Sequence, residues 1–113
     1  MLDPLTARIA KAQEQARKRA DQLRLAVPDV VATLVRHGAS RVRMFGSLAT
    51  GKQPHAGTDL DLCIWGLDDS ALLRATCEFL ERGLPVQLIR GETAAPRLRE
   101  RIEQEGIEVS LGS

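Results

Sequence analysis

The first part of the chain carries apolar residues at helical spacing. Between residues 4 and 25 they recur every three or four positions, with charged residues between them. Pro4 suits the first turn of a helix, and Asp3 suits the position that caps it. We therefore expect a helix here whose narrow apolar stripe is formed by Leu5, Ile9, Ala12, Ala16 and Leu23.

Pro28 interrupts this pattern, because proline lacks the N–H that a helix interior needs. A second helix is predicted over residues 29–36, closed by Gly38 as its C-terminal cap. On this basis the chain divides into an N-terminal helix, residues 1–27, and a compact domain, residues 28–113. Since its stripe is thin, we expect the first helix to pack on a partner protein or a second copy of the chain as well as on its own domain.

Four segments have the alternation or the apolar composition of β-strands. They are residues 40–45, 58–65, 85–90 and 107–111. The segment between the first two, residues 51–57, is rich in glycine and proline and is predicted to be a loop.

Two further helices are predicted between the later strands. The first is capped by the segment Asp68-Asp69-Ser70 and ends at Gly83, and the second is capped by Thr93. The residues expected to face the core are Leu73, Cys77 and Leu80 in the first and Leu98 and Ile102 in the second. Strands that are joined through helices predict an α/β fold, with a small mixed sheet and flanking helices.

Composition limits the classes of function. The formal net charge is +1, so nothing overall indicates binding to nucleic acid or to an anionic membrane. The basic run Arg17-Lys18-Arg19 is interpreted as a solvated helix face, because acids lie nearby. Cys63 and Cys77 lack the spacing of zinc ligands and are predicted to be buried free thiols. Without a leader or an apolar run of membrane length, we expect a cytoplasmic protein.

Asp59 and Asp61 are the first candidates for chemistry. Two residues at positions i and i+2 of a strand project from the same face, close enough to share one or two hard cations. The neighbouring Leu60 and Leu62 would anchor the strand in the core. This arrangement suits Mg²⁺ held by carboxylates together with substrate phosphates. Taken alone, the motif is also compatible with solvent-facing acids at the start of a strand.

Gly46 and Ser47 are the second candidates, at the end of the first strand. A helical turn that starts here would direct backbone N–H groups at a phosphate, and Gly46 would let the phosphate approach without a Cβ in the way. The Ser47 hydroxyl can donate to the same group, although a plain helix cap is the alternative. Lys52 is the nearby cation, or else a simple loop charge. If the strands are neighbours, both sites would clamp a nucleoside triphosphate.

These motifs resemble the signature of nucleotidyltransferases of the DNA polymerase β superfamily. The matching segments are Phe45-Gly46-Ser47, Gly51 and Thr58-Asp59-Leu60-Asp61-Leu62. The likeness extends over residues 31–109 and is greatest to the minimal nucleotidyltransferases, known as MNT proteins. It implies a polymerase β-like fold in which Asp59 and Asp61 are catalytic and bind Mg²⁺ or Mn²⁺, while Gly46, Ser47 and Lys52 bind ATP.

The resemblance also implies a reaction and a partner. The reaction is the transfer of AMP from ATP to a hydroxyl group, with pyrophosphate as the leaving group. MNT proteins are commonly encoded beside a helical HEPN protein, as antitoxin and toxin, and the acceptor is then a tyrosine of the toxin. We accordingly expect a HEPN-type toxin as partner.

The sequence departs from the family pattern at the third carboxylate. Gln87 stands in that place, and a neutral amide cannot take the proton of an acceptor hydroxyl. Glu92 is the nearest substitute acid but lies too far along the chain. The segment Leu48-Ala49-Thr50 also lacks the basic residues of many relatives. The chain could therefore be an active nucleotidyltransferase, a weakened one that acts as a binding-only antitoxin, or one subunit of a two-chain enzyme.

Overall fold

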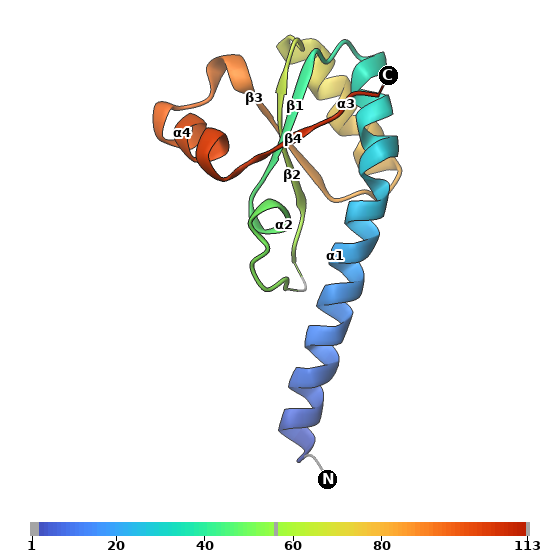
Figure 1. Ribbon diagram of the computed structural model, residues 1–113. Coiled ribbons are helices and arrows are strands. Elements are labelled where there is room, and N and C mark those ends of the chain that lie inside the picture. Colours follow the sequence, from blue (N-terminus) through green and yellow to red (C-terminus); the bar gives the residue numbers. More distant parts are fainter. Residues whose placement is uncertain (1–2, 56, 113) are drawn as a thin grey trace.

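A four-stranded mixed sheet with helices on both faces forms the body of the protein (Figure 1). The computed structural model describes residues 3–55 and 57–112. In chain order the elements are α1 (Pro4–Arg36), β1 (Arg41–Phe45), α2 (Ser47–Thr50), β2 (Leu60–Trp65), α3 (Asp69–Glu81), β3 (Val86–Arg90), the 3₁₀ turn η1 (Gly91–Thr93), α4 (Pro96–Glu105) and β4 (Ile107–Val109). The α/β fold with a small mixed sheet and flanking helices, as predicted from the sequence, is confirmed.

Helix α1 is continuous from Pro4 to Arg36, so the predicted break at Pro28 is wrong. A proline inside a helix costs about 3 kcal/mol, whereas burying one Val or Leu side chain stabilises by roughly 1.5–3 kcal/mol. Leu23, Val30 and Leu34 lie on both sides of Pro28 and all are buried in the core. Packing therefore outweighs the lost hydrogen bond, and the helix runs through the proposed boundary between residues 27 and 28. The division into two domains at that point stays a prediction.

The two ends of α1 have different surroundings. Asp3 caps the helix as predicted, accepting a hydrogen bond of 2.8 Å from the backbone N–H of Thr6. From Ala16 onward the predicted stripe packs on the domain, but Leu5 and Ile9 are 65% and 51% exposed. The N-terminal part of the helix projects beyond the sheet (Figure 1) and gives the molecule a longest dimension of 54 Å.

The strands are ordered β3-β2-β1-β4. Strand β1 is antiparallel to both β2 and β4, while β2 and β3 are parallel. One face of the sheet packs against α1 and α3, and α4 lies on the other side (Figure 1). The largest sheet residues in the core between the sheet and helices α1 and α3 are Val42, Leu60, Leu62 and Ile64.

Helix α3 turns a different face to the core than the sequence suggested. Its cap is Asp68, as predicted, but Leu73 and Leu80 are 64% and 70% exposed and Cys77 is also exposed. The buried residues are Ala71, Ala75 and Phe79. This helix carries two apolar stripes, and the stripe of small alanines lets its backbone approach the sheet closely. The predicted core positions in this helix are therefore wrong.

Helix α4 begins at Pro96 rather than just after Thr93, which belongs to the 3₁₀ turn. Proline is preorganised for the first turn of a helix and needs no side-chain cap there. Ile102 is buried as predicted. Arg43 of β1 holds the other end of the helix, donating hydrogen bonds to the carbonyl oxygens of Ile102 at 2.7 Å and Gly106 at 2.9 Å.

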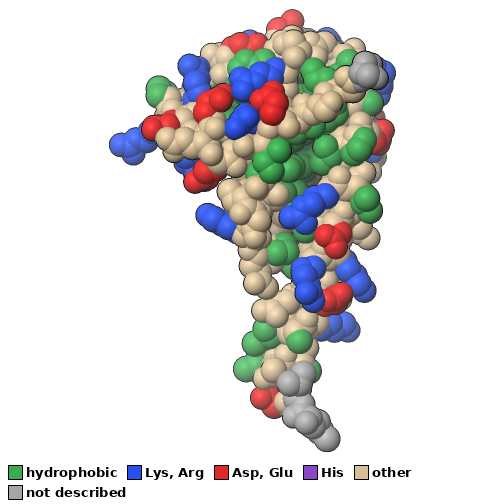
Figure 2. Space-filling model, viewed as in Figure 1, with side chains coloured by type: hydrophobic (Ala, Val, Ile, Leu, Met, Phe, Trp, Pro, Cys, Tyr) green, Lys and Arg blue, Asp and Glu red, His purple; other side chains and the backbone are tan. Residues whose placement is uncertain are grey.

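The remaining general expectations concern thiols and membranes. Cys63 is a buried free thiol, as predicted, whereas the free thiol of Cys77 is exposed. Within residues 3–55 and 57–112, no helix is long and apolar enough to cross a membrane. Basic and acidic side chains are interspersed over the face drawn in Figure 2.

Candidate functional site

Asp59 and Asp61 flank the first residue of β2. Leu60 and Leu62 are completely buried, and the backbone N–H of Leu60 donates to the carbonyl oxygen of Pro85 at 2.9 Å. Asp59 is exposed and Asp61 is half-buried. The start of the strand is thus fixed in the core, while the two acidic side chains lie at the boundary between the core and solvent.

The carboxyl group of Asp61 lies in an environment that disfavours its charge. Partial burial raises its pKa most, and the negative charge of Asp59 raises the pKa further. The second cause is the electrostatic repulsion between the two carboxylates. A bound cation would relieve both costs, because it supplies the missing opposite charge.

Gly46 brings the end of β1 against this pair. Phe45 is the strand partner of Asp61, so Gly46 follows directly at the same edge of the sheet. Its backbone has φ 77° and ψ −160°, a conformation open essentially to glycine alone. A Cβ at Gly46 would lie 2.3 Å from Oδ2 of Asp61. The motif Gly46-Ser47 and the aspartates, separated in sequence by a loop, therefore meet in space.

Ser47 is the first residue of α2, and Gly46 occupies the capping position without a side-chain bond. The carbonyl oxygen of Gly46 accepts hydrogen bonds from the N–H groups of Ala49 and Thr50, each at 3.1 Å. The alternative interpretation of Ser47 as a plain helix cap is therefore wrong. Lys52 is exposed in the loop between α2 and β2, and its role in nucleotide binding stays a prediction.

Gln87 lies beside Asp61, because the parallel register of β2 and β3 pairs these two residues. Residues paired in this way share a face of the sheet, so an exposed amide stands next to the carboxylates. Among the described residues, no three His, Cys, Asp or Glu side chains are grouped so that they could hold a metal ion. Asp59 and Asp61 are the two acids that the start of β2 places next to Gln87.

Glu92 does not complete the pair. Its carboxylate accepts a hydrogen bond of 2.9 Å from the backbone N–H of Gly66, which follows the far end of β2. This hydrogen bond holds the pKa of Glu92 below its usual value. As expected from its position in the sequence, this acid lies too far along to act with Asp61.

Arg19 is a site residue that the sequence interpretation missed. From α1 its Nε donates to the carbonyl oxygen of Thr58 at 2.7 Å, and its second guanidinium nitrogen lies 3.3 Å from Oδ1 of Asp59. The solvated face expected for this basic run is thus wrong for Arg19, whereas the neighbouring Arg17 pairs with Glu14 on the surface. Its position in the sequence could have indicated this contact, because Arg19 lies between Ala16 and Ala20 on the buried side of the helix.

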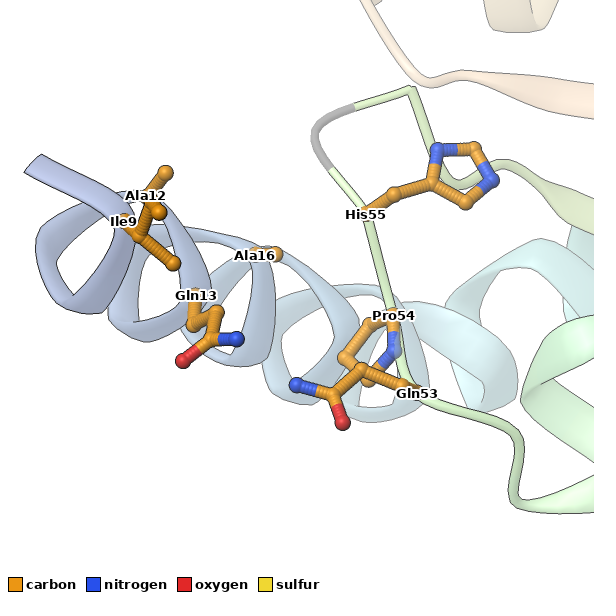
Figure 3. A pocket seen from close by; sticks show the side chains of 7 residues that line it. All are labelled: Ile9, Ala12, Gln13, Ala16, Gln53, Pro54 and His55. Atoms are coloured by element: carbon orange, nitrogen blue, oxygen red, sulfur yellow. The ribbon is translucent and has the colours of Figure 1, made fainter. Parts of the chain in front are cut away.

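A cavity of about 350 Å³ lies between α1 and the loop before β2 (Figure 3). The loop from Gln53 to His55 runs across the helix there. The lining residues are Ile9, Ala12, Gln13, Ala16, Gln53, Pro54 and His55. Neither Gly46 nor the two aspartates line this cavity, so it is distinct from the candidate site.

Comparisons with known proteins give matches among solved structures. No protein-family model matches the chain, and no curated protein matches it. A proposed minimal nucleotidyltransferase is 31% identical, with 86% of this chain and 95% of that chain covered and a TM-score of 0.55.

Two complexes are more distant in sequence. A toxin–antitoxin structure with AMP-PNP is 20% identical, with 72% of this chain and 70% of that chain covered and a TM-score of 0.57. A tri-AMPylated Shewanella oneidensis HEPN toxin in complex with its MNT antitoxin gives 16% identity, 76% and 70% coverage and a TM-score of 0.58. At these identities the likeness is one of fold.

Proposed function

The chain belongs to the minimal nucleotidyltransferases, and from this premise we propose that it binds ATP with Mg²⁺ or Mn²⁺ and transfers AMP to a hydroxyl of a partner protein. The contact between Gly46 and Asp61 carries the proposal, because it joins a bare backbone turn to a carboxylate pair. A triphosphate needs both a close backbone approach and a cation.

In this proposal Asp59 and Asp61 hold the cation. Carboxylate oxygens are the hard ligands that Mg²⁺ and Mn²⁺ prefer. The raised pKa of Asp61 means that its ionised form lacks a compensating positive charge, which a bound cation would supply. The side-chain oxygen of Gln87, on the neighbouring strand, could add a neutral ligand. When bound, the cation supplies charge neutralisation at the phosphates.

Gly46, Ser47 and Lys52 receive the phosphates. The backbone at Gly46 has no Cβ to keep a phosphate away, and the Ser47 hydroxyl can donate a hydrogen bond. Lys52 is exposed on the next loop and can approach as a flexible point charge.

During transfer, the oxygen of the acceptor hydroxyl forms a bond to the α-phosphorus, and the bond to the leaving pyrophosphate breaks. The hydroxyl proton must pass to a base or to water. Gln87 cannot accept it, so we expect slower transfer than with a third carboxylate.

As partner we propose a HEPN-type toxin, with this chain as its antitoxin. The fold likeness to an MNT antitoxin in complex with a tri-AMPylated HEPN toxin supports this assignment. The second candidate is a weakened nucleotidyltransferase that acts by binding alone or as a subunit of a two-chain enzyme. Gln87 is the observation that favours it.

Calorimetric titration with AMP-PNP and Mn²⁺ tests the nucleotide site without requiring turnover. The parent protein should bind, and the double variant Asp59→Asn with Asp61→Asn should lose the metal-dependent part of the affinity. A surface control is Asp21→Asn, which alters an exposed acid on α1. Metal-dependent affinity that is unchanged in the double variant would refute the proposal. Label transfer from α-labelled ATP to a co-expressed toxin then separates the two candidate functions.

A further inference from the structure

Helix α1 reaches the candidate site through Arg19. This residue lies where the packed part of the helix meets its projecting part, next to the buried Ala16 and Ala20. Its side chain contacts the two residues that precede β2, Thr58 and Asp59. A helix distant in sequence thus touches a proposed metal ligand.

The two contacts of Arg19 differ in strength. The hydrogen bond to the Thr58 carbonyl oxygen is short, at 2.7 Å, and part-buried. The ion pair with Asp59 is longer, at 3.3 Å, and its two side chains are 37% and 47% exposed. Exposed ion pairs contribute little, whereas a hydrogen bond from a charged donor is strong. Arg19 therefore acts mainly on the backbone at Thr58.

The backbone around Asp59 is held from both sides. The Thr58 side chain is buried, and its hydroxyl accepts a hydrogen bond from the N–H of His55 at 2.9 Å. On the other side, the backbone N–H of Leu60 donates a hydrogen bond to the carbonyl oxygen of Pro85. Asp59 itself precedes the strand, and the Arg19 hydrogen bond acts on the carbonyl group directly before it.

We infer that Arg19 is a positioning residue for Asp59, an inference that rests on the proposed nucleotide and metal site. It holds the Thr58 carbonyl so that the Asp59 carboxylate faces the same cation as Asp61. Its weak ion pair with Asp59 partly neutralises the negative charge of the two carboxylates before the cation binds. Asp59 can leave that ion pair when the cation binds, while the bond to Thr58 remains.

The test measures Mn²⁺-dependent binding of AMP-PNP by calorimetry. Groups that orient a metal ligand typically contribute about 10–100-fold to metal affinity, so Arg19→Ala should weaken this binding by about that factor. Arg19→Lys should retain part of the affinity, because an ammonium can reach one of the two acceptors but not both. Arg24→Ala is the matched control, since Arg24 pairs with Asp21 on the same helix and should leave the affinity unchanged.

A double-mutant cycle separates positioning from a general structural role. In the Asp59→Asn background, Arg19→Ala should cause little further loss, since the ligand that it positions is already gone. Equal losses in both backgrounds would overturn the inference, as would unchanged binding in Arg19→Ala. Thermal melting of each variant identifies any that fails to fold, and Arg19→Lys then carries the comparison. A parent that does not bind the nucleotide would instead refute the proposed function, and the inference with it.

Discussion

The backbone of Gly46 lies against the carboxylate of Asp61, so closely that a Cβ at Gly46 would be 2.3 Å from Asp61 Oδ2. Real Cβ atoms do not tolerate such a distance. The glycine is therefore required by the acid as well as by its own backbone conformation. One residue of the turn and one residue of the neighbouring strand consequently form a single structural unit.

Gly46→Ala should disturb this unit. The new methyl group must displace Asp61, and a residue held in so sparsely populated a backbone region costs about 1–3 kcal/mol in addition. Gly51→Ala is the control for a positive φ without a close contact, since Gly51 has a φ of 72° with open space around its Cβ position, although its ψ of 14° places it in the milder αL region. Urea denaturation should show a larger loss for Gly46→Ala, accompanied by loss of nucleotide binding. Equal losses in the two variants would contradict both the close contact and the additional backbone cost at Gly46.

Asp61→Asn should stabilise the protein in the absence of metal and nucleotide. Burial, and then the charge of Asp59, raise the pKa of Asp61 in the folded state. The folded state therefore binds this proton more tightly than the unfolded state, and stability falls as the pH rises from the unfolded value through the folded one. At neutral pH the ionised group is thus destabilising, and an amide avoids that cost.

Melting curves at neutral pH and near pH 3 check this expectation. The gain from Asp61→Asn should appear at neutral pH and disappear in acid, where the carboxyl group is protonated in both states. The same variant should lose Mn²⁺-dependent binding. A lower melting temperature at neutral pH would mean that the charge of Asp61 is already compensated within the protein.

The strands and the mixed sheet could be predicted because their signals are local. Val42 and Met44 alternate with Arg41 and Arg43, and this alternation is visible within five residues. The continuity of α1 could not be predicted, because it depends on what covers the helix on both sides of Pro28. The buried face of α3 could not be predicted for a similar reason. Leu73 and Phe79 belong to different apolar stripes, and packing against the sheet decides that the stripe with Phe79 is buried.

In the candidate site, too, some residues could be predicted from the sequence and others could not. Asp59 and Asp61 could be identified from their spacing, and resemblance placed Gln87 on the third strand. Arg19 was missed because its partners, Thr58 and Asp59, are 39 and 40 positions away. No local pattern encodes such a contact, and a charged residue on an alanine stripe is at best an indication of it.

Removing residues 1–12 should leave the domain folded. Leu5 and Ile9 are exposed and lie outside the buried part of α1, which begins at Ala16. The melting temperature should therefore change little. If this segment packs on a partner or on a second copy of the chain, as the sequence predicts, the mass in solution or the affinity for the proposed toxin partner should fall. Light scattering and a co-purification assay measure these quantities, and unchanged values in both would refute the predicted role of the segment.

Gln87 offers the most direct test of how this protein acts. The register pairs it with Asp61, so its amide stands where a third carboxylate would adjoin the other two. A carboxylate there would repel both neighbours in the metal-free state but could hold the cation and accept the proton of an acceptor hydroxyl. Gln87→Glu and Gln87→Asp should therefore lower the melting temperature without metal and raise the affinity for Mn²⁺ with AMP-PNP.

The same substitutions should increase AMP transfer, since a general base usually contributes about 10²–10⁴-fold in rate. The assay is label transfer from α-labelled ATP to a co-expressed HEPN-type toxin, with Gln53→Glu as the control for an added charge on the exposed loop. Slow transfer by the parent and a gain in the acid variants would identify Gln87 as the cause of weakened catalysis. Rapid transfer by the parent, with no gain from either acid, would show that two carboxylates suffice. In that case the proton must leave through Asp59, Asp61 or water, and the binding-only alternative would lose its support.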